Sequence, residues 1–405
     1  MNKSFCMLMC GLLLAGCTSK RIAVSTFDSY RGLVMAGYQG WFNAEGDSEN
    51  RGFYHYTGRN GFRPGSATVD MWPDVSEYEK SYTTEFRMAD GSAARVFSSS
   101  DASTVDTHFR WMKEYGLDGV FMQRFVGEIK GQSGRSHFNK VLSSAMDAAK
   151  KYGRAICVMY DLSGMRPEDS EILLADIKEV ADGYGLFDRK TNPSYLYHNG
   201  KPLVAVWGVG FDDGRAYGLD DCAAIISGLK DQGYSVMIGV PTHWRELNGD
   251  TTSDPALHDI IRQCDIVMPW FVARYTPDTF GNFKGLIADD AKWCADEGLD
   301  YAPLVFPGFS WKNMYGKETH AIPRNRGGFL QSQIDYSLDA GAKMLYVAMF
   351  DEIDEGTAIF KCATEVPVDS LGTSFVPIED GLGSDHYLKI VGNAAKTLKK
   401  RIRSN

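Results

Sequence analysis

The stretch MLYVAMFDEIDEG, from Met344 to Gly356, changes abruptly from an apolar run to a group of acids. Its first part carries no charged side chain and does not alternate apolar with polar residues. An uninterrupted apolar run is typical of a strand that is buried on both faces of a parallel sheet. The run is followed at once by the carboxylates Asp351, Glu352, Asp354 and Glu355. The stretch therefore predicts a buried strand with an acidic C-terminal end.

Seven similar segments precede this one, and stretches with a helical pattern separate them. The segments are GLVMAGYQGWF (32–42), DGVFMQRFVG (118–127), AICVMYDLSG (155–164), PLVAVWGVGF (202–211), SVMIGVPTHW (235–244), DIVMPWFVARY (265–275) and APLVFPGFSW (302–311). Several helical stretches end on glycine just before the next segment, a common helix stop. Eight buried strands that alternate with helices predict an α/β fold, a single (β/α)8 TIM barrel over residues 31–405.

One gap between the predicted strands is much longer than the others. It runs from Asn43 to about Ala102, directly after the first strand. Loops that follow barrel strands lie on the catalytic face, so we expect this insertion to form part of a substrate cleft. The amphipathic segment 387–404 predicts a last helix that closes the barrel.

The N-terminus has the layout of a bacterial lipoprotein leader. One lysine and a short apolar run precede LAGC, residues 14–17, which resembles a lipobox. The resemblance implies that residues 1–17 are a signal peptide with its lipobox, that Cys17 is lipidated, and that 18–30 is a tether. We therefore expect a lipid anchor in the bacterial cell envelope, on its periplasmic or cell-surface face. An ordinary secretory signal with a chance cysteine is the alternative.

Charge and cysteine usage exclude several classes of function. The net charge of −9 gives no global attraction to nucleic acid or to an anionic lipid surface, so we expect membrane attachment to come from the acyl chains at Cys17 and not from the folded body. Five cysteines lie beyond the leader without CxxC spacing, so we expect core cysteines, with one disulfide as an alternative, and no metal site. We expect no cofactor and a monomer.

The ends of the predicted strands are rich in aromatic and hydrogen-bonding side chains. Such a mixture suits a carbohydrate, whose ring faces stack on Trp and Tyr while its hydroxyls need directed partners. Arg324 and Asn325, in the loop IPRNRGGF after the seventh strand, could clamp a hydroxyl-rich or anionic group. Packing or a solvated loop is the alternative for each residue. The substrate-binding candidates are Tyr38, Trp41, Arg124, Asp161, Trp207, His243, Trp244, Tyr275, Trp311, Arg324 and Asn325; Gln39, Gln123, Trp270 and Arg274 also lie at or near strand ends.

Two of the four acids have the spacing of a catalytic pair. Glu352 and Glu355 are three residues apart, so a helical turn after the strand would point both to one side. Their mutual repulsion would separate their pKa values, and cleavage of a glycosidic bond needs one protonated and one ionised carboxyl group. A solvated acidic turn is the alternative.

The chain resembles the endo-α-mannosidases and mannanases of glycoside hydrolase family 99, and more loosely the α-1,3-glucanases of family 71. The resemblance rests on the first strand with Tyr38 and Trp41, on VMYD (158–161), on PGFSW (307–311) followed by PRN (323–325), and on FDEIDEGT (350–357). It implies a retaining hydrolase of an α-linked glycan, with an α-mannan-like substrate. Glu352 would be the base that assists the sugar 2-hydroxyl through a 1,2-anhydro intermediate, and Glu355 the general acid/base.

The chain departs from the family pattern beside the two glutamates. Asp351 replaces an asparagine, Ile353 an aromatic residue, and Asp354 a histidine or similar residue. The added negative charge should favour the protonated form of both glutamates. Two other functions remain open: a surface lipoprotein that binds glycan without cleaving it, and a metal-dependent isomerase or lyase whose carboxylates hold a divalent cation.

Overall fold

The computed structural model describes residues 27–404, without the side chains of residues 317–320. The leader, Cys17 and most of the predicted tether lie outside the described residues.

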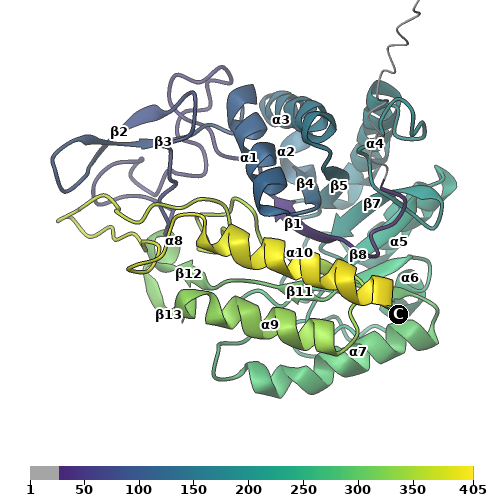
Figure 1. The fold of residues 1–405 in the computed structure, drawn as a ribbon. Helices are drawn as coiled ribbons and strands as arrows, with labels where there is room; N and C mark the ends of the chain where they lie inside the picture. The colour runs from purple at the N-terminus through teal and green to yellow at the C-terminus, as the bar shows by residue number, and fades with distance from the viewer. Residues whose placement is uncertain (1–26, 405) are drawn as a thin grey trace, which may run out of the picture.

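All eight predicted segments contain strands of one curled parallel sheet (Figure 1). The sheet order is β10-β9-β8-β7-β5-β4-β1-β14-β11. β10 pairs with β9 and β11 pairs with β14, and only Ala302 and Pro303 separate β10 from β11. The chain from Asp300 to Val305, which includes the start of the seventh segment, therefore joins both edges of the sheet and closes the barrel, which confirms the predicted fold. The bounds are β1 Val34–Tyr38, β4 Gly119–Phe125, β5 Ala155–Asp161, β7 Lys201–Trp207, β8 Ser235–Val240, β9 Ile266–Pro269, β10 Asp300–Tyr301, β11 Leu304–Val305 and β14 Leu345–Val347.

Alternate residues of each strand enter two different cores. Val158 belongs to the core between the sheet and the helices, while Cys157 and Met159 belong to the core inside the barrel. Both faces of the sheet are therefore buried, which explains why the segments are apolar without alternation.

Helices surround the barrel, and α9 and α10 cross the near side in Figure 1. α1, α3 and α4 end at the left-handed glycines Gly116, Gly153 and Gly185, as the sequence predicts. The bounds are α1 Ala102–Tyr115, α2 Val126–Ile129, α3 Gln132–Tyr152, α4 Ser170–Tyr184, α5 Leu219–Asp231, α6 Ala256–Ile261, α7 Lys284–Asp296, α8 Lys312–Tyr315, α9 Gly328–Asp339 and α10 His386–Ser404.

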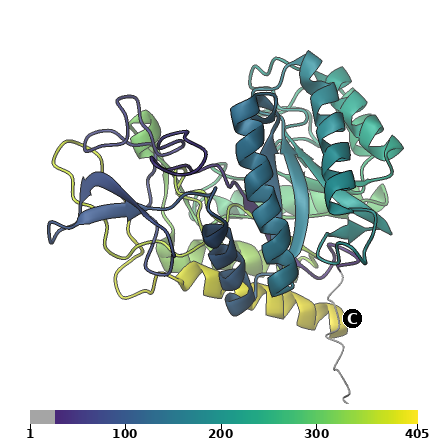
Figure 2. The ribbon, with the colours of Figure 1, turned by 90° about the horizontal axis from the view of Figure 1, so that it is seen from above.

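The insertion after β1 forms a lobe at one end of the molecule. It contains the antiparallel hairpin of β2 (Tyr82–Arg87) and β3 (Ala93–Val96), and it lies beside the segment before α10 in Figures 1 and 2. Backbone bridges join Met71 to Val376 and Arg87 to Val368. The lobe therefore packs on the segment that precedes α10.

Two further short pairs complete the sheet structure. β12 (Phe309–Trp311) and β13 (Lys317–Ile322) form a hairpin after β11, and β6 (Tyr197–His198) pairs antiparallel with β7. The described cysteines are buried and free, and no helix within residues 27–404 is long and apolar enough to span a bilayer.

Candidate active site

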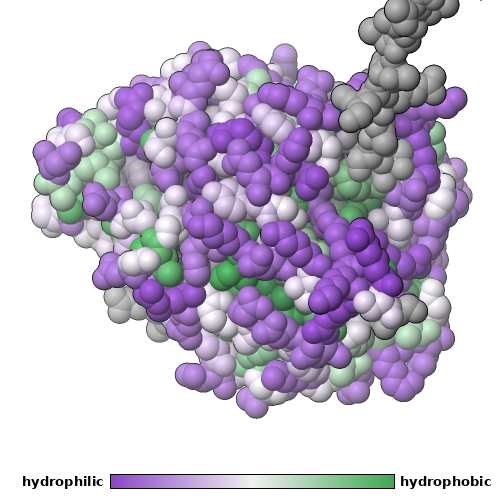
Figure 3. Space-filling view, viewed as in Figure 1, coloured by the Kyte–Doolittle hydropathy of each residue, from purple (hydrophilic) through white to green (hydrophobic). Residues whose placement is uncertain are grey.

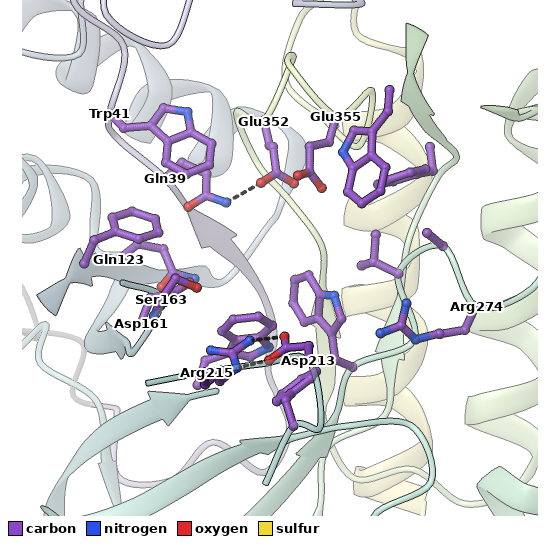
Figure 4. Close-up of a pocket in the computed structure, with 18 residues that line it drawn as sticks. Gln39, Trp41, Gln123, Asp161, Ser163, Asp213, Arg215, Arg274, Glu352 and Glu355 are labelled. Carbon is purple, nitrogen blue, oxygen red and sulfur yellow. Dashed lines mark hydrogen bonds and ion pairs between the residues drawn. The ribbon is translucent and has the colours of Figure 1, made fainter. Parts of the chain in front are cut away.

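A cavity of about 450 Å³ opens among the C-terminal ends of the barrel strands (Figure 4). Four tryptophans share its wall with carboxyl, amide and guanidinium groups. The lining residues are Gln39, Trp41, Gln123, Phe125, Asp161, Ser163, Trp207, Phe211, Asp213, Arg215, Trp270, Val272, Ala273, Arg274, Phe309, Trp311, Glu352 and Glu355.

Glu352 and Glu355 lie next to each other on this wall. The amide of Gln39 donates a hydrogen bond to Oε1 of Glu352, and the Thr357 hydroxyl donates to Oε2 over 2.5 Å. Glu352 is only 3% exposed. Two donors on a buried carboxyl group favour its ionised form against the cost of desolvation.

The chain after β14 does not form the helical turn that the spacing suggested. Residues 353–356 make a tight turn instead, in which Gly356 has φ 67°, a conformation that glycine adopts without strain. Arg324 holds this turn from behind: its two terminal nitrogens donate to the carbonyl oxygens of Gly356 and Ala358 at 2.9 and 2.8 Å. Both glutamates reach the cavity through this turn geometry.

Burial and mutual repulsion hold all four acids at unusually high pKa values. Burial raises the pKa of Glu355 to about 7, and the charge of Asp354 contributes, while a hydrogen bond from the Trp311 indole acts in the opposite direction. Burial and the charge of Glu355 raise the pKa of Glu352 as well. Burial likewise raises the pKa of Asp351 to about 7 and that of Asp354 to about 8. The glutamate pair therefore holds a proton near neutral pH.

The two aspartates that depart from the family pattern lie behind the cavity wall. Asp351 accepts the backbone N–H groups of Gln39 and Gly40 at 2.7 and 2.9 Å, which ties the end of β1 to the end of β14. Asp354 is 1% exposed, and its Oδ2 lies 3.4 Å from Nδ1 of His55. These acids shape and charge the site without lining it.

The insertion reaches the site through His55 and through the backbone N–H groups of Asp70 and Met71, which donate to the carbonyl oxygen of Ile353. The ring of His55 stacks on Trp41, with centroids 3.9 Å apart and an interplanar angle of 7°. Burial lowers the pKa of His55 to about 3, so its imidazole is neutral. We expected the insertion to form part of the substrate cleft. The residues that line the cavity come instead from other loops, and the insertion contacts Trp41 through His55.

The register of parallel strands brings other lining residues together. Asp161 on β5 lies opposite Trp207 on β7, and both face the cavity. Arg215 packs its guanidinium over the rings of Phe211 and Trp207, at 4.7 and 5.1 Å, and makes a bidentate ion pair with Asp213. This wall combines ring faces with paired donors and acceptors.

A second arginine, Arg274, also borders the cavity (Figure 4). Nε of Arg274 donates to Asp250 over 2.9 Å, and Asp250 accepts the backbone N–H groups of Thr242 and His243. Ala273, just before it, has φ 62°, a backbone conformation that non-glycine residues adopt at a cost. Arg274 is therefore held in place by its Nε group at the cavity rim.

Six of the residues predicted from the sequence line the cavity. They are Trp41, Asp161, Trp207, Trp311, Glu352 and Glu355.

Tyr38 and Arg124 lie elsewhere, because they point outward from their strands. Tyr38 is fully buried and hydrogen-bonds to His108 over 2.8 Å. Arg124 makes a buried ion pair with Asp176, which also accepts the hydroxyl of Tyr160. Their neighbours in sequence, Gln39 and Gln123, occupy the cavity instead, since side chains alternate along a strand.

The remaining candidates also differ from expectation. Trp244 packs on Trp293 and donates to Asp290, and Tyr275 donates to Gln333 in an aromatic core. His243 is half-buried and lies outside the cavity lining, and Asn325 is exposed. Arg324 clamps the turn that carries Glu355, as described above, and does not line the cavity.

Sequence reasoning missed the contribution of the loops after β5 and β7. Ser163, Phe211, Asp213 and Arg215 line the cavity from positions two to eight residues beyond their strands. The segment FDDGR, residues 211–215, offered a signal, since charged residues beside an aromatic follow a buried strand there. Within residues 27–404, no group of three or more His, Cys, Asp or Glu side chains has the arrangement of a metal site.

Comparison with protein-family models finds no match. Among solved structures, the chain is similar to the family 99 endo-α-mannosidase of Bacteroides thetaiotaomicron, both alone and in complex with bis-tris-propane. Each comparison gives a TM-score of 0.66 and 15% identity, and covers 94% of this chain and 100% of the other. A glycoside hydrolase-like protein matches with a TM-score of 0.52 at 14% identity, over 81% of this chain and 94% of the other. The chain therefore shares the fold of a family 99 endo-α-mannosidase across nearly its whole length, as the motif resemblance implied.

Proposed function

We propose that the protein is a retaining glycoside hydrolase that acts on an α-linked glycan. The observation that carries the proposal is the pair Glu352 and Glu355, which lie together in a cavity walled by four tryptophans. A pair of carboxyl groups that shares a proton, beside aromatic platforms, meets the chemical demands of glycosidic cleavage. The similarity in fold to an endo-α-mannosidase supports the same class of reaction.

The surroundings of the two glutamates favour different roles. Burial and the charge of Glu355 raise the pKa of Glu352, while the hydrogen bonds from Gln39 and Thr357 act in the opposite direction and hold the carboxyl group in place, as a base directed at the sugar 2-hydroxyl requires. Glu355 has a pKa of about 7, partly because Asp354 repels its charged form, and this suits a proton donor to the leaving group. Glu355 would then accept a proton from water when the anhydro sugar opens.

The substrate is proposed to be an α-mannan or a related polysaccharide or oligosaccharide. The family resemblance supports the sugar, and the tryptophan wall supports a pyranose chain. The two extra acids near the glutamates lie behind the wall, so they affect proton affinity more than the shape of the cavity.

Substitution of each glutamate tests the proposal. Glu352→Gln and Glu355→Gln should each reduce hydrolysis of α-mannan oligosaccharides at least ~1000-fold while folding, followed by circular dichroism, is unchanged. The exposed Glu365→Gln is the matched control and should retain full activity. NMR of the first products should show the α-anomer, and substantial turnover by both variants would contradict the assignment.

The alternative functions predict different results. A glycan-binding protein without activity would bind oligosaccharides in a calorimeter, release no product, and keep its affinity in both glutamate variants. A metal-dependent isomerase or lyase would lose its activity in EDTA, whereas the proposed hydrolase should not.

We also propose that Cys17 carries the lipid anchor in the cell envelope. Mass spectrometry of the mature N-terminus should find an acylated cysteine, and Cys17→Ala should move the protein out of the membrane fraction. The released protein should run as a monomer in light scattering.

A further inference from the structure

The described chain begins at the end of the barrel that lies opposite the cavity. The segment before β1 is fastened there: the carbonyl oxygen of Phe27 accepts the N–H of Tyr197, and the N–H of Gly32 donates to the carbonyl oxygen of Lys343. The end of α10 packs at the same place, and a side chain at Gly32 would meet Ile402 at 3.7 Å. In Figure 1 the C-terminus lies at the right, while α8 and the β12–β13 hairpin lie at the left.

This end of the barrel carries a concentration of positive charge. A groove of about 760 Å³ between α9 and α10 is lined by Arg31, Lys343, Lys400 and Arg401, with Asp339 as its acid. Arg403 follows on the last turn of α10. We call these five cations the basic end, and Figure 3 shows the outward face of α10 as strongly hydrophilic near its C-terminus.

Most of this positive charge is not neutralised locally. Arg401 pairs with Asp339, and Arg31 pairs with Asp300. Across the described part of the chain, Lys343, Lys400 and Arg403 have no ion-pair partner, and all three are exposed. An acidic protein of net charge −9 therefore presents a local excess of cations on one surface.

The position of this surface matches the proposed anchor. Ten residue steps separate Cys17 from Phe27, so covalent geometry limits the distance between them to ~36 Å. Acyl chains on Cys17 would keep the end of the barrel where the described chain begins within that distance of the bilayer. The acyl chains would fix one point of the protein near the bilayer, and an electrostatic contact would fix its orientation.

We propose that the basic end binds the anionic headgroups of the bilayer. The barrel would then lie with its basic end on the membrane and with its cavity facing away from the membrane. The exposed cations supply the attraction, and Ile402, which is 41% exposed beside them, supplies an apolar contact at the interface. The inference rests on the proposed membrane location and is independent of the proposed hydrolysis, since no residue of the basic end lines the cavity.

Vesicle binding by the unacylated mature chain, from Thr18 onward, tests the surface itself. It should sediment with phosphatidylcholine vesicles that contain phosphatidylglycerol, and not with phosphatidylcholine alone. The triple variant Lys343→Glu, Lys400→Glu and Arg403→Glu should bind at least ~100-fold more weakly, because each cation near an anionic surface contributes about fivefold. Raising the salt concentration should weaken binding by the unmodified chain.

A second triple variant of equal charge change is the matched control. Arg59→Glu, Arg63→Glu and Arg87→Glu alter exposed cations of the insertion, at the other end of the molecule, and should leave vesicle binding within about threefold. Equal loss in the two variants, or no binding by the unmodified chain, would overturn the proposal. Full glycosidase activity in the basic-end variant would show that the fold is intact.

Hydrogen exchange of the lipidated full-length protein on nanodiscs tests the orientation. Anionic lipid should slow exchange in residues 396–404 and leave residues 352–358 unchanged. Protection of 352–358 in place of 396–404 would mean that the cavity faces the membrane, and the proposal would be wrong.

Discussion

Asp354 and His55 meet behind the cavity wall, with Oδ2 of the aspartate 3.4 Å from Nδ1 of the histidine. The other oxygen, Oδ1, is buried and has no hydrogen-bond partner within the described structure. Because the histidine is neutral, the pair is not a salt bridge, and the carboxyl group is most stable when it holds its proton. The protonation of this carboxyl group therefore affects both the free energy of unfolding and the pKa values of the neighbouring acids.

Asp354→Asn should stabilise the protein at alkaline pH. The folded-state pKa of about 8 lies above the ordinary value of 3.8, so the folded protein holds a proton that the unfolded chain releases between these pH values. The free energy of unfolding therefore falls as pH rises through this window, and the asparagine removes this contribution. We expect a gain on the order of a few kcal/mol at pH 8 and little difference at pH 4. Thermal unfolding across pH measures it, with the exposed Asp380→Asn as control.

The same substitution should move the alkaline limb of the activity profile. Burial raises the pKa of Glu355 to about 7, and repulsion from Asp354 contributes because the two carboxyl groups titrate as a pair; the asparagine removes this repulsion and so lowers the pKa of Glu355. A proton donor with a lower pKa loses its proton at lower pH, and we expect kcat/KM to fall about 0.5–1 pH unit earlier in the variant. An alkaline limb that stays in place would show that Asp354 does not influence the donor.

Arg324→Lys should impair catalysis more than binding. Lysine keeps the charge, but its single nitrogen replaces the two guanidinium nitrogens that donate separately to the carbonyl oxygens of Gly356 and Ala358, so the turn that carries Glu355 loosens. We expect kcat to fall ~10-fold or more with KM nearly unchanged. Arg326→Lys, at an exposed neighbouring site, should behave like the unmodified protein. A rise in KM alone would indicate a direct contact with the sugar.

Asp176→Asn should destabilise the fold without weakening substrate binding. It removes the partner of Arg124, which is 1% exposed and would be left as an uncompensated buried charge. We expect a loss of about 3–5 kcal/mol in urea unfolding, and an unchanged KM at low temperature. Asp182→Asn breaks an exposed ion pair with Lys178 and should cost less than ~1 kcal/mol. A large rise in KM without loss of stability would contradict this and indicate that Arg124 contacts the sugar.

The barrel itself was predictable because its signal is local. Each strand had to be apolar at consecutive positions to face two cores at once, and the glycines that end α1, α3 and α4 mark the helix stops. Glu352 and Glu355 were also recognisable, since acids directly after a buried run must leave the core at the rim.

The sequence by itself determined the barrel, the acidic strand end and the aromatic character of the catalytic face. Only the tertiary structure decided which strand-end side chains enter the cavity: Gln39 rather than Tyr38, Gln123 rather than Arg124, and Asp161 rather than Tyr160. Neighbours along a strand point to opposite faces, so one step of register separates the cavity from the helical layer. That register depends on hydrogen bonds between strands distant in the chain, which no local pattern of residues encodes.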